Sequence, residues 1–301
     1  MAKTLIVGAT GHLGQEMVKA CAAAGNEIHA LVRPETRNDI NKMKGLKAAR
    51  ATLHEGDLKR YDSLLAACKA VDNVVSTVGG MQIGDELALI KAVKEAGVKR
   101  FIPSDFGLDP AAAGPNSCVL FDAKAMIHQA IKAASIPYTF VHANGFFSYW
   151  VRTLGDLTKL MGDQLPPAAV NIYGDGNVKG SFASLADIAA VTARALNDPN
   201  MQNKEVRIIA NTLTQNELVD LWQKQSGRTV KKTRVSAQDL ETIIASSTTP
   251  EQGMLLVLAQ LHRSVWIRGD AVKRAGAAQD ATRLYQDIKL QTVEEAFAQH
   301  N

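Results

Sequence analysis

The chain has 301 residues, and its 34 basic against 30 acidic side chains give a formal net charge of +4. With 46% hydrophobic and 21% charged residues, the composition is typical of a globular protein with room for one large domain or two smaller ones. No apolar run approaches the roughly 20 residues of a membrane helix, and Gly8 comes too early for a signal peptide. We therefore expect a cytoplasmic protein that spans no membrane.

The positive charge is concentrated near the N-terminus. Residues 31–60 contain eight basic and four acidic side chains, which accounts for the whole surplus. Nucleic-acid-binding proteins usually carry a longer basic stripe with aromatic residues among the charges, and this window contains no Phe, Tyr or Trp. The window favours a small anionic ligand and argues against a nucleic-acid partner.

The cysteines indicate neither a disulfide framework nor a metal site. Cys21, Cys68 and Cys118 are odd in number and widely spaced, and they form no zinc-ligand pattern with histidine. We expect three reduced thiols and no bound metal.

Short apolar runs and helical stretches alternate through the first half of the chain. Strands are expected at Thr4–Val7, Glu27–Val32, Ala51–His54, Asn73–Thr77, Arg100–Pro103 and Tyr138–His142. Helices are expected at Leu13–Ala24, Tyr61–Ala70, Asp85–Ala96 and Phe121–Ala134. Alternation at this spacing predicts a parallel sheet with right-handed crossovers.

The second half is rich in turn residues and then mostly helical. Helices are expected at Thr214–Gln225, Ala237–Ala245 and Gly253–Arg263. Thr214 and Glu217 have the spacing of a capping box. We expect a Rossmann-type, doubly wound α/β domain over residues 1–150, to which the chain returns near 175–200. Residues 151–301 are expected to form a smaller, mixed α/β part that binds the substrate.

A glycine-rich loop separates the first predicted strand from the first helix. Its GxxGxxG pattern permits a tight turn and a close approach of the backbone to a pyrophosphate. The helix that follows presents N–H groups and the positive end of its dipole to phosphate. The predicted cofactor contacts in this loop are Gly8, Thr10, Gly11, His12, Leu13 and Gly14.

The second predicted strand is followed by Arg33. Proteins that select NAD usually carry Asp or Glu at this point, whereas Arg accommodates the 2′-phosphate of NADP. We expect Arg33 to bind that phosphate, with Arg37 and Lys42 as further candidates and the other basic residues in a solvated loop. Glu35 leaves open the alternative that an acid binds a ribose hydroxyl. The preferred cofactor is NADPH.

Small residues follow the fourth predicted strand. Thr77, Val78 and Gly79 would let a ligand approach the backbone at the edge of the sheet, and a simple turn is the alternative. After the third strand, Asp57 is expected either near an adenine or at the start of the next helix.

Segments along the whole chain together resemble one family. They are Val7–Gly14, Leu31–Pro34, Val98–Gly107, Lys124, Ile136–Val141, Asn144–Phe147, Gly174–Asn177, Asp187-Ile188, Asn211–Leu218 and Thr292–Glu295. They look like the isoflavone reductase and phenylcoumaran benzylic ether reductase group, within the NmrA-like atypical short-chain dehydrogenases. Taken jointly the motifs are specific for the family but not for a substrate.

The resemblance implies NADPH and a pocket between a Rossmann-type domain and a smaller C-terminal one. It implies a phenolic or quinone-like small-molecule substrate; the chain is expected to be a monomer or homodimer. Further cofactor contacts are expected at Ser104, Phe106, Lys124, Asn144 and Phe146. Expected substrate contacts are Met81, Gln82, Phe147, Tyr149 and Trp150, and core packing is the alternative for Phe147 and Tyr149.

The resemblance also implies that Lys124, twelve residues before Ile136, is catalytic. Burial among apolar neighbours would lower the pKa of a lysine toward values useful for general acid–base chemistry. Asp105 departs from the family, which more often has Glu at this position, and His128 and His142 are expected to be structural. The expected function is NADPH-dependent reduction of an aromatic or conjugated molecule. A non-catalytic NADP(H) sensor and a quinone reductase are the alternatives.

Overall fold

A parallel sheet forms the base of the molecule. The computed structural model describes residues 1–273, 276 and 278–298, so the last three positions of the predicted C-terminal part lie outside the described residues. The first five strands are β1 (Lys3–Val7), β2 (Glu27–Val32), β3 (Thr52–Glu55), β4 (Asn73–Ser76) and β5 (Arg100–Ile102). Their order in the sheet is β3-β2-β1-β4-β5, and every neighbouring pair is parallel. The predicted fold class is confirmed.

Strands from later in the chain extend this sheet. A bridge between Phe101 and Tyr138 joins β5 to β6 (Thr139–His142). Next to β6 runs β11 (Lys204–Arg207), and β14 (Gln279–Asp280) pairs with β11. The sheet is therefore completed by segments more than sixty residues away from β6 in the sequence.

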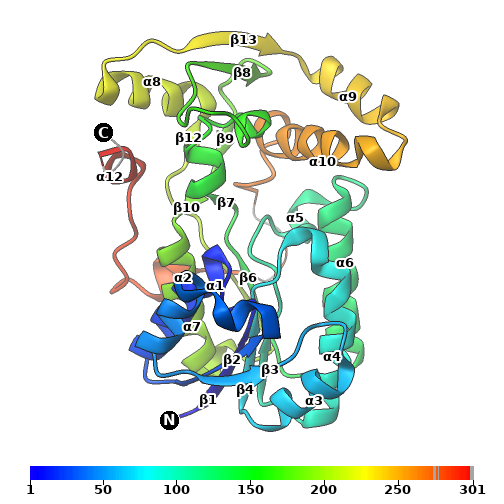
Figure 1. Ribbon diagram of the computed structural model, residues 1–301. Helices are drawn as coiled ribbons and strands as arrows, with labels where there is room; N and C mark the ends of the chain where they lie inside the picture. The colour runs from blue at the N-terminus through cyan, green and yellow to red at the C-terminus, as the bar shows by residue number, and fades with distance from the viewer. Residues whose placement is uncertain (274–275, 277, 299–301) are drawn as a thin grey trace.

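Helices cover both faces of the sheet (Figure 1). On one face lie α1 (His12–Ala23) and α7 (Leu185–Asn197); on the other lie α3 (Tyr61–Lys69), α4 (Glu86–Ala96) and α6 (Val119–Ala133). Successive side chains of β1 pack into two different hydrophobic cores. Ile6 packs into the core on the α1 side of the sheet, and Leu5 and Val7 pack into the core on the other side. A strand buried on both faces reads as a continuous apolar run, which is why β1 and β4 were visible in the sequence.

A second, smaller lobe lies above the sheet in Figure 1. Its strands are β8 (Ala169–Tyr173) beside β13 (Lys231–Val235), β7 (Gly145–Phe146) beside β10 (Phe182–Ala183), and β9 (Lys179–Gly180) beside β12 (Leu213–Thr214). Its helices are α8 (Gln215–Ser226), α9 (Ala237–Ser246), α10 (Gly253–His262) and α12 (Val293–Ala298). Two short helices, α5 (Pro110–Ala113) and α11 (Ala281–Leu284), complete the fold. No helix in the described part of the chain is long and apolar enough to cross a membrane.

Five of the described helices were not predicted from the sequence: the short helices α5, α11 and α12, and the longer helices α2 (Ile40–Ala48) and α7. The expected basic loop contains α2, which begins where the Asp39 side chain accepts a hydrogen bond from the backbone N–H of Lys42. Only Met43 and Leu46 of α2 are buried, so its apolar periodicity is too weak to be recognised. The helix α7 was also missed, although Ser184 and Asp187 form a capping box at its start.

Candidate active site

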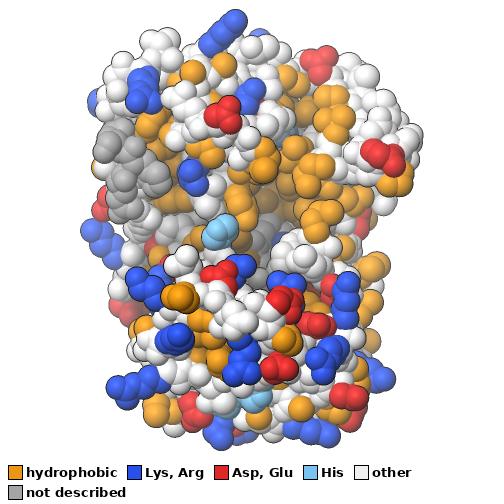
Figure 2. All heavy atoms as spheres, viewed as in Figure 1, with side chains coloured by type: hydrophobic (Ala, Val, Ile, Leu, Met, Phe, Trp, Pro, Cys, Tyr) orange, Lys and Arg blue, Asp and Glu red, His pale blue; other side chains and the backbone are white. Residues whose placement is uncertain are grey.

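Two cavities meet above the carboxyl ends of β1 and β4. The glycine-side cavity measures about 590 Å³ and extends from the glycine loop to the end of β2. The lysine-side cavity measures about 370 Å³ and is bounded by β5, α6 and the upper lobe. Both are lined by Gly11 and by Thr77, Val78 and Gly79, so they form one continuous groove. Figure 2 shows the surface hollowed between the two lobes, with hydrophobic side chains gathered on its upper side.

The glycine loop needs glycine for two separate reasons. Gly8 has a φ of +83°, and a Cβ on it would lie 2.9 Å from the carbonyl oxygen of Thr77. A Cβ on Gly14 would lie 2.1 Å from the carbonyl oxygen of Gly8. The first glycine thus permits the turn and the second permits the close packing of α1 on β1. Of the predicted loop residues, Gly8, Thr10, Gly11, His12 and Leu13 line the groove, whereas Gly14 lies behind it.

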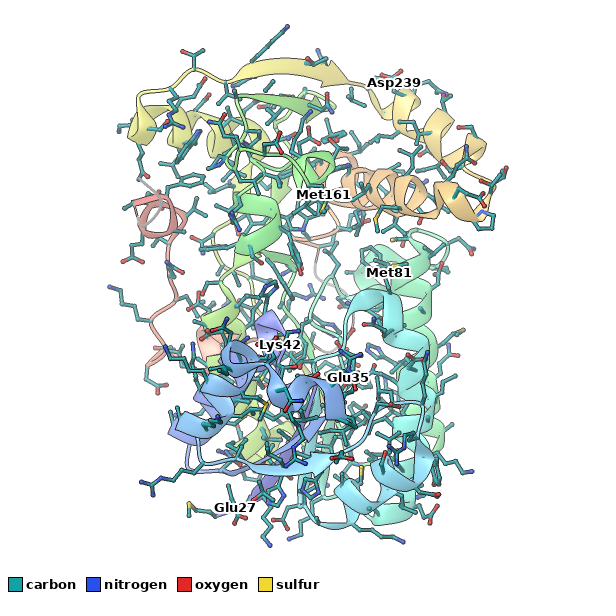
Figure 3. All side chains as sticks on the ribbon, viewed as in Figure 1. Glu27, Glu35, Lys42, Met81, Met161 and Asp239 are labelled. Carbon is teal, nitrogen blue, oxygen red and sulfur yellow. The ribbon has the colours of Figure 1, made fainter. Side chains whose placement is uncertain are left out.

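Arg33 lines the glycine-side cavity together with Glu35 and Asp57. The Arg33 guanidinium Nε lies 3.5 Å from a Glu35 carboxylate oxygen, and both side chains are more than half exposed. Arg37 instead pairs with Glu55 at 3.1 Å, and Lys42 pairs with Asp39 at 3.4 Å. Neither is among the residues that line the groove. Figure 3 shows Lys42 on α2 and Glu35 on the turn before it.

Asp57 does not cap the helix that follows it. Its carboxylate accepts a hydrogen bond from the backbone N–H of Lys59, whereas α3 begins after Arg60. Gln82 also lines the glycine-side cavity, while Met81 is 74% exposed and lines neither part of the groove (Figure 3). Of the two residues predicted on this turn to contact substrate, only Gln82 reaches the groove.

The upper wall of the lysine-side cavity is aromatic. Phe146, Tyr149 and Trp150 line it, and Phe146 and Tyr149 stack with ring centres 5.7 Å apart. Phe147 lies elsewhere, since it is 7% exposed, belongs to the upper core and borders a separate cavity. Residues 147–151 form a π-helical turn, in which side chains point in different directions from those of an α-helix.

Lys124 reaches the lysine-side cavity from α6. Its Nζ donates a hydrogen bond of 3.0 Å to the backbone carbonyl of Asp105, and a Cβ on Gly107 would come within 2.5 Å of it. Burial lowers the pKa of Lys124, an effect opposed by the negative charges of Asp105 and Glu86. The pKa of Lys124 therefore lies below that of a surface lysine.

Three other predicted contacts hold the backbone around Lys124. The Ser104 hydroxyl donates a hydrogen bond to the carbonyl of Val78 at 2.7 Å. The backbone N–H of Ser104 donates a hydrogen bond to the Glu86 carboxylate at 3.0 Å. Asn144, with a φ of +58°, donates from its backbone N–H to the carbonyl of Gly107. Phe106 lies between them and lines the cavity with Ser104 and Asn144. These residues join the ends of β4, β5 and β6 at one edge.

Sequence reasoning missed several apolar residues of the lysine-side cavity. They are Ile83, Leu108, Leu120, Phe121, Leu185 and Leu261. Leu185 begins α7 and Leu261 lies near the end of α10, so the fold brings them to Lys124 from far along the chain. An isolated leucine in a helix carries no local signal that distinguishes a cavity wall from a core.

The sheet order, the glycine loop and the groove define a dinucleotide-binding α/β protein. The chain belongs to the NmrA-like family, whose model matches residues 1–297. It is 40% identical to pinoresinol reductase 1 of Arabidopsis thaliana, with 97% of this chain and 95% of that protein covered. It is 39% identical to isoflavone reductase of Cicer arietinum, with 99% and 98% covered.

A solved structure shares the whole fold. The protein AtPrR2 with NADP⁺ and (+)pinoresinol is 38% identical and superposes with a TM-score of 0.85, covering 98% of this chain and 97% of that one. The resemblance to the isoflavone reductase group, drawn from short motifs, is therefore confirmed over the full length.

Proposed function

We propose that this chain is an NADPH-dependent reductase of aromatic or conjugated small molecules, of the phenylpropanoid, lignan or isoflavonoid kind. The chain is an oxidoreductase that uses NADPH, as expected for a full-length relative of pinoresinol and isoflavone reductases. The observation that carries the proposal is the continuous groove, which links a glycine loop at one end to a partly buried lysine at the other.

The groove fits the cofactor in shape and charge. The glycine loop and the start of α1 would hold the pyrophosphate, and Arg33 would bind the 2′-phosphate. Thr77, Val78 and Gly79 would lie along the nucleotide, with Ser104 and Phe106 nearer the nicotinamide. When bound, NADPH supplies a hydride. In this proposal residues 1–150 mainly bind the cofactor and residues 151–301 mainly form the substrate side.

Lys124 is proposed as the general acid or base. Its amine would give a proton to, or take one from, an oxygen of the substrate. Its lowered pKa and its place in the cavity wall support this role. The aromatic side chains of Phe146, Tyr149 and Trp150 would bind a flat ring by offset or edge contacts.

The proposal is tested by NADPH oxidation with a panel containing (+)pinoresinol, an isoflavone and a quinone. We expect oxidation with at least one phenolic compound, and Lys124→Ala should lower kcat by about 100-fold or more while NADPH still binds. Lys132→Ala removes a more exposed lysine from the same helix and should leave the rate unchanged.

Other outcomes distinguish the alternatives. NADPH binding without oxidation of any compound would favour a sensor, and oxidation with the quinone alone would favour a quinone reductase. Full activity in Lys124→Ala with a phenolic substrate would remove the lysine from the mechanism.

The buried, unpaired thiols of Cys21, Cys68 and Cys118 support a reducing, cytoplasmic location.

A further inference from the structure

A buried carboxylate lies directly behind Lys124. Asp105 follows β5, and its side chain is 2% exposed. One carboxylate oxygen, Oδ2, lies 2.9 Å from Nε2 of His128 and 2.9 Å from Nδ1 of His142. The backbone carbonyl of the same residue accepts the hydrogen bond from Lys124. Asp105 therefore contacts Lys124 through its backbone and two histidines through its side chain.

The spacing of residues on α6 lets two of its side chains contact Asp105. Lys124 and His128 are four residues apart, so their side chains lie on the same face of the helix. Lys124 reaches the Asp105 carbonyl while His128 reaches its carboxylate. From the other side, His142 at the end of β6 holds the same carboxylate. The residue that accepts the lysine hydrogen bond is thus fixed to both α6 and the sheet.

The charged groups of this cluster shift one another's pKa values. Burial lowers the pKa of His142, but the Asp105 carboxylate outweighs it and raises that pKa to about 9. Burial raises the pKa of Asp105, but the two histidines hold it well below its usual range. On its far side, His142 approaches Glu205 at 3.4 Å. A protonated His142 therefore lies between two carboxylates.

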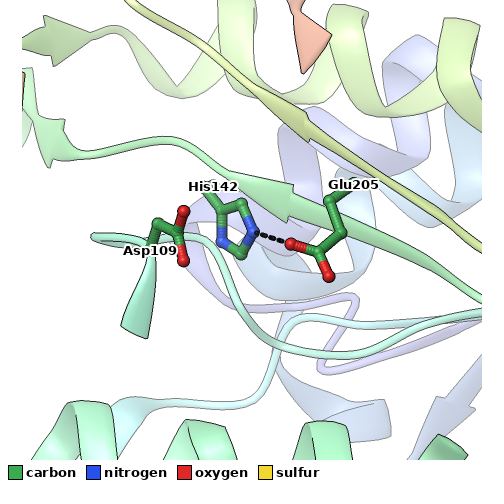
Figure 4. Close-up of side chains that lie close together, drawn as sticks. All are labelled: Asp109, His142 and Glu205. Atoms are coloured by element: carbon green, nitrogen blue, oxygen red, sulfur yellow. Dashed lines mark hydrogen bonds and ion pairs between the residues drawn. The ribbon is translucent and has the colours of Figure 1, made fainter. Parts of the chain in front are cut away.

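The same cluster contains a group with metal-ligand spacing, which Figure 4 shows. One potential ligand atom each from Asp109, His142 and Glu205 lies within 4.8 Å of the others. However, the Asp109 carboxylate is ion-paired with the buried Arg207, and His142 is held by Asp105 and Glu205. We interpret these contacts as ion pairs within the protein. Arg207 already pairs with the Asp109 carboxylate, and His142 already lies against the Glu205 carboxylate.

The turn that carries Asp105 is shaped for the lysine. The carbonyl of Gly107 accepts a hydrogen bond from the N–H of Asn144 at 3.0 Å. Any side chain on Gly107 would place its Cβ 2.5 Å from the Lys124 Nζ. Glycine at this position therefore leaves the space that the amine occupies between the turn and the cavity.

We infer that Asp105, held by His128 and His142, is a positioning residue that fixes the Lys124 amine at the wall of the lysine-side cavity. The inference rests on the proposed function, because the position of the Lys124 amine affects turnover only if the lysine takes part in the reaction. It also predicts a property of the amine that can be measured without turnover. A cluster that served stability alone would not affect the reactivity of Lys124 in the folded protein.

The first arm of the test measures the amine directly. Folded protein is treated with trace acetic anhydride over a pH series, and acetylation of Lys124 is followed by peptide mass spectrometry relative to Lys289, which is 88% exposed. The charged and titratable groups near Lys124 are Asp105, Cys118 and Glu86. Asp105→Asn keeps the backbone carbonyl but weakens the histidine contacts that hold it, and Gly107→Ala pushes the amine away from it. In both variants we expect the acetylation rate of Lys124 to rise by about tenfold, the effect of weakening one hydrogen bond to the protonated amine.

Two matched variants serve as controls. Asp156→Asn removes another fully buried carboxylate, one that accepts hydrogen bonds from Thr158, Asn171 and Tyr173 in the upper lobe. It should lower stability and leave Lys124 acetylation unchanged. Gly84→Ala adds a Cβ where no atom lies within 4 Å and should change neither property.

The second arm measures turnover with the compound that gives NADPH oxidation. Asp105→Asn and Gly107→Ala should lower kcat by about 100-fold with the KM for NADPH unchanged, as expected for a displaced catalytic group. Acetylation of Lys124 at the wild-type rate in folded Asp105→Asn would overturn the inference. If no compound is reduced, the proposed function fails, while the acetylation arm still decides whether Asp105 positions the amine. Should Asp105→Asn not fold, His128→Asn, which removes one of the two histidine contacts to the same carboxylate, carries the test with the same expected rise in acetylation.

Discussion

Arg33 is the residue on which we propose that cofactor choice depends. Arg33→Glu would place a second carboxylate beside Glu35 in the glycine-side cavity. We expect NADPH affinity to fall by roughly 10- to 100-fold, because a charged hydrogen bond is lost and the 2′-phosphate is repelled, while NADH affinity changes little. Titration of both cofactors by nucleotide fluorescence checks this. Arg37→Glu is the matched control, and equal loss of NADPH and NADH in Arg33→Glu would contradict the assignment.

His142 makes stability depend on pH in the alkaline range. Its pKa is raised from 6.5 to about 9 in the folded protein, so its contribution is fully present below pH 6.5 and is lost as the pH rises through about 9. The loss should be on the order of 3 kcal/mol. Urea unfolding at pH 6.5, 8 and 9.5 measures it. His142→Gln should remove most of this slope, and a parallel slope in both proteins would refute the assignment.

At the scale of elements, α8 shows what a cap contributes. The Thr214 side chain accepts from the N–H of Glu217, and the Glu217 carboxylate accepts from the N–H of Thr214. Thr214→Ala should lower the free energy of unfolding by about 1 kcal/mol. Urea denaturation measures the change. Thr242→Ala, within α9, is the control, because alanine has the higher helix propensity there and the loss should be absent.

The elements also show where local signals suffice. The capping box of α8 was recognised from Thr214 and Glu217 because both residues act within one turn. The basic helix α2 carries no comparable signal, because only two of its residues are buried. A helix with a narrow apolar face, such as α2, is therefore missed by periodicity, but α7 was missed although eight of its residues are buried.

At the scale of the whole molecule, the two lobes should unfold together. Trp150, Trp222 and Trp266 all lie in the core of the upper lobe, whereas the glycine loop and Arg33 lie in the sheet domain. NADPH at 100 times its Kd should add about 2.7 kcal/mol to the stability of the state that binds it. If the lobes are coupled, the transition followed by tryptophan emission wavelength shifts with the transition followed by circular dichroism. An unfolding transition followed by tryptophan emission that does not shift with NADPH would show that the two lobes unfold independently.

The sequence by itself determined the first six strands of the sheet, the glycine loop and the position of Arg33 after β2, because each depends on residues close together in the chain. Strand alternation, a tight turn and the charge after β2 are local properties. The tertiary structure alone decided that Trp150 lines the lysine-side cavity while Phe147 borders a separate one, since a π-helical turn sets their directions. It also brought His128 and His142 to one carboxylate of Asp105. Such contacts depend on the order of strands and the packing of α6, which no local pattern encodes.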